Sequence, residues 1–197
     1  MRRVAKVMLV LATLAALLAA RGDAADLKIG DAAPNFRNLI GVDDNRHSLS
    51  DYGRAKLVVV VFTCNHCPVA QAYEKRLIAL QKKYDAKGVQ FVAVNVNKLP
   101  DDQLAAMKTR AEQKGFNFPY LFDATQKIGH QYGALVTPHV FLLDRQRKIA
   151  YIGAVDDSMQ PGDVKNSYLR DAIEAQLAGK KPPQQTTTAF GCGIQYE

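Results

Sequence analysis

The chain has 197 residues, 48% of them hydrophobic, and a formal net charge of +7, which is enough material for one domain with a sizeable core. Without residues 1–25 it loses four basic residues and one acidic residue, so the net charge falls to +4. Lys and Arg form no block and are not interleaved with aromatic residues, so the charge favours a solvated surface and we expect no nucleic-acid partner.

Residues 1–25 have the pattern of a secretory signal peptide. A positive start, Met1–Lys6, precedes an apolar run, Val7–Ala20, and small residues around Gly22–Ala25 could form a cleavage site. The apolar run is too short to cross a bilayer, which needs roughly 20 residues. We therefore expect cleavage, no stable membrane insertion afterwards, and a periplasmic or secreted protein.

The elements predicted after residue 25 alternate between short apolar runs and amphipathic stretches, which is typical of an α/β protein. The run Leu57–Phe62 is β-branched and apolar throughout, so it should be a central strand buried on both faces. The others, in chain order, are a polar-tipped hairpin at 36–49, a helix at about 67–86, a strand at 89–94, a helix at 101–114, a strand at 118–122, a helical segment at 124–132, a strand hairpin at 140–152 and a last helix ending at Gly179.

These elements predict one α/β domain at 26–179, a central mixed sheet flanked by helices with an N-terminal hairpin extension. Residues 180–197 form a polar tail that contains Pro182 and Pro183 and carries Cys192, and we expect its first part to be extended.

The stretch FTCNHCPVA, residues 62–70, carries the most informative motif. Cys64 and Cys67 follow the predicted central strand where a helix begins. A structural disulfide between them would close too small a loop to stabilise the fold much. The backbone N–H groups and dipole of the helix would instead stabilise a thiolate on Cys64, and Cys67 could then resolve a mixed disulfide. His66 could add a positive charge that lowers the pKa of Cys64 further.

Several segments resemble the thioredoxin-like fold, and in particular the exported redoxins related to the alkyl hydroperoxide reductase and thiol-specific antioxidant superfamily. They are LVVVVF leading into CNHCP, VTPHVFLLD about seventy residues later, APNF near the start and GCGIQY at the end. The resemblance implies a cis Thr137–Pro138 bond lying against the disulfide, with the backbone of Thr137 presented to an incoming peptide.

The chain departs from thioredoxins in three ways. It has no Trp, Asn65–His66 replaces the usual Gly-Pro dipeptide between the cysteines, and no acidic residue lies in the strand before them to accept a proton. His66 favours a more oxidising Cys64–Cys67 couple, because stabilising the thiolate of the reduced form raises the reduction potential.

The preferred hypothesis is a thiol-disulfide oxidoreductase. Cys64 attacks, Cys67 resolves, His66 tunes the thiol, and Thr137 with Pro138 positions a protein or small-molecule thiol or disulfide substrate. We expect no cofactor and no bound metal. The sequence identifies neither the redox partner nor the direction, since one dithiol fold can reduce, oxidise or isomerise.

A peroxiredoxin-like thiol peroxidase is a second hypothesis, since peroxiredoxins share this architecture. Their motif also has Pro seven residues and Thr or Ser three residues before the reactive cysteine, and neither Cys64 nor Cys67 fits it.

A copper-binding or metallochaperone module is a third hypothesis, with Cys64, Cys67 and either His66 or His139 as ligands. A lone histidine such as His139 is more often a surface residue.

Cys192 leaves two readings open. An odd cysteine in an exported chain suggests intermolecular pairing, a reactive thiol or a resolving partner, and the flanking glycines would make it mobile enough to reach the motif. The alternative is a packed tail thiol.

Two acidic pairs are expected to be structural: Asp101–Asp102 in the first turn of a helix, and Asp156–Asp157 in a solvated turn.

Overall fold

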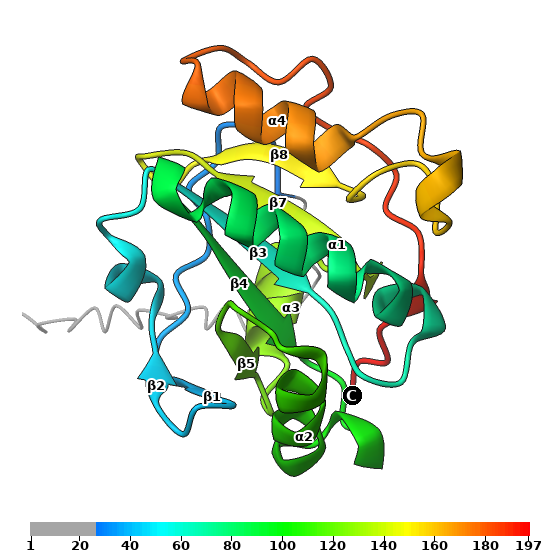
Figure 1. Cartoon of the computed structure of the whole chain (residues 1–197). Helices are drawn as coiled ribbons and strands as arrows, with labels where there is room; N and C mark the ends of the chain where they lie inside the picture. Colours follow the sequence, from blue (N-terminus) through cyan, green and yellow to red (C-terminus); the bar gives the residue numbers. More distant parts are fainter. Residues whose placement is uncertain (1–26) are drawn as a thin grey trace, which may run out of the picture.

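The computed structural model describes residues 27–197, so the predicted signal peptide lies outside the described part of the chain (Figure 1). No helix among the described residues is long and apolar enough to span a bilayer. The strands are β1 (Leu39–Gly41), β2 (Arg46–His47), β3 (Leu57–Phe62), β4 (Val89–Asn95), β5 (Tyr120–Phe122), β6 (Val136–Thr137), β7 (His139–Leu143), β8 (Ile149–Gly153) and β9 (Cys192–Gly193). The α-helices are α1 (Pro68–Tyr84), α2 (Leu104–Lys114), α3 (Lys127–Tyr132) and α4 (Tyr168–Leu177).

The seven-stranded sheet has the order β2-β1-β5-β4-β3-β7-β8 and is mixed. Strand β3 pairs parallel with β4 and antiparallel with β7, and β7 continues as an antiparallel hairpin into β8. All six residues of β3 are buried, as its uniformly apolar sequence predicts for a strand covered on both faces. The predicted hairpin extension is β1 with β2, whose β1 strand joins the sheet edge at β5.

The side chains of β3 alternate between two apolar layers. Val59 and Val61 pack in the layer that contains buried residues of α1, α2 and α4, and Val58 and Val60 pack in the layer that contains those of α3. This alternation follows from the period of two in a strand. The predicted α/β fold with helices on both faces of a mixed sheet is confirmed.

Two predicted boundaries differ near the motif. Cys67 has an extended backbone and is the N-cap of α1, so the helix begins at Pro68, a residue suited to the first helical position because it has no N–H to leave unpaired. Asp101 and Asp102 do not open α2: they lie in a separate 3-10 turn, Pro100–Asp102, and the extended Gln103 separates that turn from the helix.

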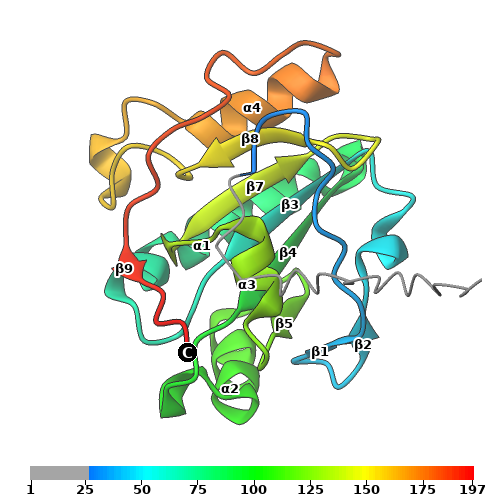
Figure 2. The same ribbon diagram turned by 180° about the vertical axis from the view of Figure 1, so that it is seen from behind.

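The C-terminal tail crosses the molecule in contact with the domain (Figure 2). Its Gln185–Thr187 segment hydrogen-bonds with Ile152 of β8, and β9 then pairs with β6. Farther on, the Tyr196 hydroxyl donates to the carbonyl of Ala134. The tail is therefore attached at three successive points, and Cys192 is held in β9 by strand pairing.

Candidate active site

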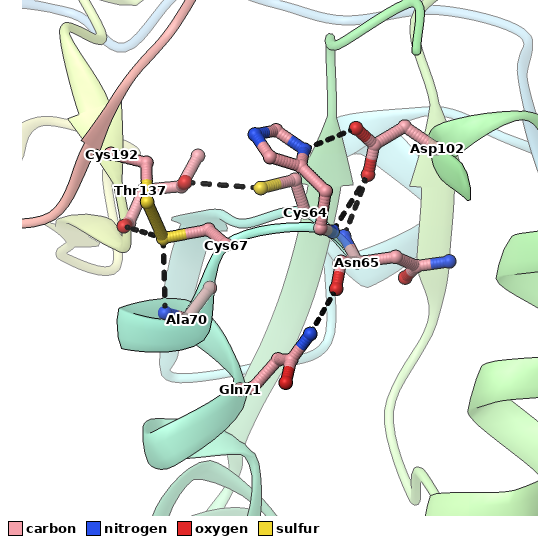
Figure 3. The surroundings of a disulfide bond; sticks show 9 residues. Cys64, Asn65, Cys67, Ala70, Gln71, Asp102, Thr137 and Cys192 are labelled. Carbon is pink, nitrogen blue, oxygen red and sulfur yellow. Dashed lines mark hydrogen bonds and ion pairs between the residues drawn. A yellow bond between two sulfur atoms is a disulfide. The ribbon is translucent and has the colours of Figure 1, made fainter. Parts of the chain in front are cut away.

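The two motif cysteines lie between the carboxyl end of β3 and the first turn of α1, and both sulfur atoms contact Thr137 (Figure 3). Cys64 Sγ is 3.1 Å from Thr137 Oγ1, and Cys67 Sγ is 3.3 Å from the Thr137 carbonyl oxygen. Thr137 comes from β6, about seventy residues later, and reaches the motif because β7 pairs with β3. The Thr137–Pro138 bond is cis, as the resemblance implied.

Cys67 forms a disulfide with Cys192, and Cys64 is a free thiol. The Cα atoms of the bonded pair are 5.8 Å apart across a sequence separation of 125 residues. Of the two readings left open for Cys192, a partner for the motif and an unpaired packed thiol, the structure has the partner. The sequence could not decide between these readings, because the pairing depends on β9 lying beside β6.

The expectation of a low pKa at Cys64 is wrong in this state. Burial and, to a smaller extent, the negative charge of Asp102 raise the pKa of its thiol from 9.0 to about 11, outweighing the hydrogen bond from Thr137. Backbone N–H groups of His66 and Cys67 do favour the thiolate, as the helix-start argument predicts, but the side chain is only 3% exposed. Desolvation of the thiolate therefore outweighs these hydrogen bonds, and the pKa of Cys64 is raised.

Asp102 is the site residue that the sequence reasoning missed. Its carboxylate is fully buried, pairs with His66 Nδ1 at 2.5 Å and accepts the backbone N–H of Asn65 at 2.7 Å. The prediction that Asp102 only interacts with the dipole of a helix is wrong. The absence of an acid from β3 suggested a site without a buried carboxylate, yet Asp102 supplies one from the loop after β4.

Asn65 fixes the loop between the cysteines. Its side-chain oxygen accepts from the Tyr120 hydroxyl at 3.0 Å, its amide donates to the carbonyl of Asp101 at 2.7 Å, and its own carbonyl accepts from Gln71 at 2.7 Å. The dipeptide that distinguishes this motif thus has two separate roles, since Asn65 anchors the loop while His66 meets Asp102.

Ligand atoms of Cys64, His66 and Asp102 lie within 4.8 Å of one another. This trio differs from the set considered for copper, because the Cys67 sulfur is bonded to Cys192 and a carboxylate takes the third place. His139 is not part of it. That residue is 8% exposed, accepts the Leu135 N–H at 3.4 Å, and burial lowers its pKa to about 4. The expectation of a surface histidine is wrong.

In the second acidic pair, Asp156–Asp157, one residue differs from the predicted solvated turn. Asp156 is buried and receives hydrogen bonds from the Tyr73 hydroxyl and from Arg76, whereas Asp157 binds backbone N–H groups of Lys165 and Asn166 at the surface. Asp156 is therefore a structural anchor of α1 and not a solvated turn residue.

The redoxin family model matches residues 28–168. The chain belongs to the redoxin family. A relative from Geobacillus thermodenitrificans, the thiol-disulfide oxidoreductase ResA, is 30% identical over 137 residues that cover 70% of this chain and 74% of the relative. The predicted family and an oxidoreductase of thioredoxin-like fold are confirmed.

Solved structures have the same fold. An uncharacterised conserved protein of Geobacillus kaustophilus superposes with a TM-score of 0.81 and 36% identity, covering 87% of this redoxin and 93% of that chain. A Chlorobium tepidum protein, provisionally titled thiol:disulfide interchange protein DsbE, has a TM-score of 0.62 and 28% identity, covering 78% and 97% of the two chains.

Proposed function

We propose that this redoxin is an exported thiol-disulfide oxidoreductase that works through Cys64 and Cys67. The observation that carries the proposal is the contact of both sulfur atoms with Thr137, beside the Thr137–Pro138 bond and at the start of α1. The redoxin family and the relative named as a thiol-disulfide oxidoreductase support the same class of reaction.

The proposed reduction has two exchange steps. The Cys64 thiolate attacks one sulfur of a substrate disulfide, forming a mixed disulfide, and the displaced substrate thiolate takes a proton. The Cys67 thiolate then attacks Cys64 Sγ, forming the Cys64–Cys67 disulfide and releasing the second substrate thiol. The substrate gains two electrons, which the dithiol loses. Run in reverse, the same steps oxidise a substrate dithiol.

His66 and Thr137 have supporting roles in this proposal. The imidazole lies within 4.8 Å of Cys64 and is oriented by Asp102, so it is placed to receive the thiol proton or to supply positive charge. Thr137 donates to or accepts from the Cys64 sulfur, and Pro138 fixes the course of that backbone. Substrates are protein or small-molecule thiols and disulfides, and a separate redox partner renews the pair.

Export is proposed from the first 25 residues, and a periplasmic or secreted location follows from it. An oxidising compartment suits a protein whose cysteines exchange disulfides. The peroxidase alternative is not favoured, because neither Cys64 nor Cys67 has the Pro seven residues and the Thr or Ser three residues before it that the peroxiredoxin motif contains.

The test uses Cys64→Ser and Cys67→Ser variants of the protein without residues 1–25. We expect each to lower the rate of disulfide exchange with a model peptide by at least about a hundredfold, as expected when an attacking or resolving thiol is lost. Peroxide consumption is measured in parallel. A Cys64→Ser variant with the wild-type exchange rate would refute the proposal, and rapid peroxide consumption would favour the peroxidase instead.

A further inference from the structure

The C-terminal strand β9 occupies the place where a peptide would pair with the site. It runs antiparallel to β6, with Cys192 opposite Thr137 and Gly193 opposite Val136. Thr137 is also the residue that both motif sulfurs contact. Adding an extended segment to an exposed strand edge is a common mode of peptide recognition. The chain thus fills this edge with its own residues.

The Cys67–Cys192 disulfide is a second feature that β9 shares with a bound peptide substrate. Cys67 is fully buried and Cys64 is 3% exposed, whereas Cys192 is partly exposed. Cys192 is therefore the more exposed residue of the bonded pair, and it packs against the cluster that contains the other two cysteines. A covalent bond to a motif cysteine together with strand pairing at Thr137 resembles a mixed disulfide with a peptide, with the difference that the bonded cysteine is the resolving Cys67 and not the attacking Cys64.

We propose that Cys192 is a third redox residue and that β9 acts as an internal substrate; this rests on the proposed function. In the exchange step the Cys64 thiol loses its proton to a base and its thiolate attacks Cys67 Sγ. The Cys67–Cys192 bond breaks, the Cys64–Cys67 bond forms, and Cys192 leaves as a thiolate that takes a proton. One disulfide and one thiol are present before and after, so no outside oxidant or reductant is needed.

Tail contacts on both sides of Cys192 keep it close after the bond opens. Upstream, Thr187 bonds with the backbone of Ile152 and, at 2.6 Å, with the Tyr151 hydroxyl. Downstream, Tyr196 reaches the Ala134 carbonyl at 2.7 Å. A thiol tethered in this way has a high effective concentration, so β9 can return to Cys67 or give way to an external peptide.

Gly191 and Gly193 provide a matched pair of variants that leave all three cysteines in place. A Cβ at Gly191 would collide with the carbonyl group of Thr137, whereas a Cβ at Gly193 would meet no atom within 4 Å. Gly191→Ala should therefore prevent β9 from docking, and Gly193→Ala should not.

The experiment equilibrates each protein in graded glutathione buffers, quenches with acid, alkylates, and maps disulfides by mass spectrometry. Cys64 and Cys67 share the tryptic peptide 57–75, so their disulfide is internal to it, while a bond to Cys192 joins it to the tail peptide. For Gly191→Ala we expect the ratio of the tail-linked form to the internal form to fall at least about tenfold, equivalent to about 1.4 kcal/mol of lost docking. Gly193→Ala should match the wild type, and Cys64→Ser should show the tail-linked form alone.

Two outcomes would overturn the inference: a wild type without a Cys67–Cys192 bond at any buffer potential, or equal ratios for the two glycine variants. The proposed function has a separate readout. If the tail-linked form is absent but Cys64→Ser still abolishes exchange, only the role of Cys192 fails. If Cys64→Ser exchanges normally, the proposed function itself fails, whichever disulfide is found.

Discussion

Cys64 and Asp102 determine the acid-base behaviour of the site. The thiol is held protonated by burial first and by the Asp102 carboxylate as well, and its pKa is raised to about 11. The folded chain therefore binds this proton more tightly than the unfolded chain does. The resulting stabilisation is present below pH 9, the ordinary pKa, and is lost as the pH rises through about 11.

The first prediction concerns the pH dependence of Cys64 alkylation in the oxidised protein. The wild-type rate should rise up to an inflection at a pH of about 11. Asp102→Asn removes a negative charge but keeps an oxygen for the Asn65 N–H, so the inflection should move to lower pH. At pH 9 the rate should increase about two- to tenfold, because a like charge near the thiolate has been removed.

Asp101→Asn is the matched control for this substitution. Asp101 is exposed and contacts Asn65 through its backbone carbonyl, which the change leaves intact. Its alkylation profile should follow that of the wild type. A wild-type inflection at or below pH 9 would show that burial does not control this thiol.

Helix α1 is fixed to the loop after β8 by an ion pair between the partly buried Arg76 and the buried Asp156. Arg76 Nη1 lies 2.6 Å from Asp156 Oδ2, the Tyr73 hydroxyl donates to the other carboxylate oxygen at 2.8 Å, and the guanidinium lies over the Tyr73 ring. Arg76 also donates to the carbonyls of Ser158 and Met159. These contacts fix the position of the helix whose N-cap is Cys67.

The second prediction is that Arg76→Met lowers the free energy of unfolding by about 2–4 kcal/mol, because it leaves the buried Asp156 carboxylate without its counter-charge. Arg170→Met is the control. Its ion pair with Asp171 is about half exposed, so the cost should stay within about 0.5 kcal/mol. Denaturant unfolding measures both, and equal losses would contradict a special role for Arg76.

The elements that the sequence predicted best are those set by local periodicity. Strand β3 and helix α1 follow from uniform or helical spacing of apolar residues, and the β7–β8 hairpin follows from two apolar runs around a polar turn. Asp102 and β9 could not be predicted in this way. Each acquires its role from a partner far along the chain, His66 for the carboxylate and Thr137 for the strand, and local pattern carries no information about such partners.

At the scale of the whole molecule, the Cys67–Cys192 bond closes a covalent loop that contains all the α-helices of residues 27–197. A cross-link across a sequence separation of 125 residues strongly restricts the unfolded chain. The third prediction is that reduction lowers the free energy of unfolding by about 3–5 kcal/mol.

Cys192→Ser is the control for the effect of reduction. Without the long cross-link, a reductant should change its stability little, because a Cys64–Cys67 bond closes only a small loop. Denaturant unfolding with and without reductant measures the difference. Equal changes in the wild type and the variant would contradict the prediction.

The separation of the two bonded cysteines also orders events during synthesis of the chain. At about 5–20 residues per second, Cys192 follows Cys67 by roughly 6–25 s. During that interval Cys64 is the only possible partner for Cys67 within the chain. A chain that is oxidised before Cys192 has been made therefore forms the Cys64–Cys67 disulfide first. The Cys67–Cys192 disulfide can form only after the last residues have been made and β9 has paired with β6 at Thr137.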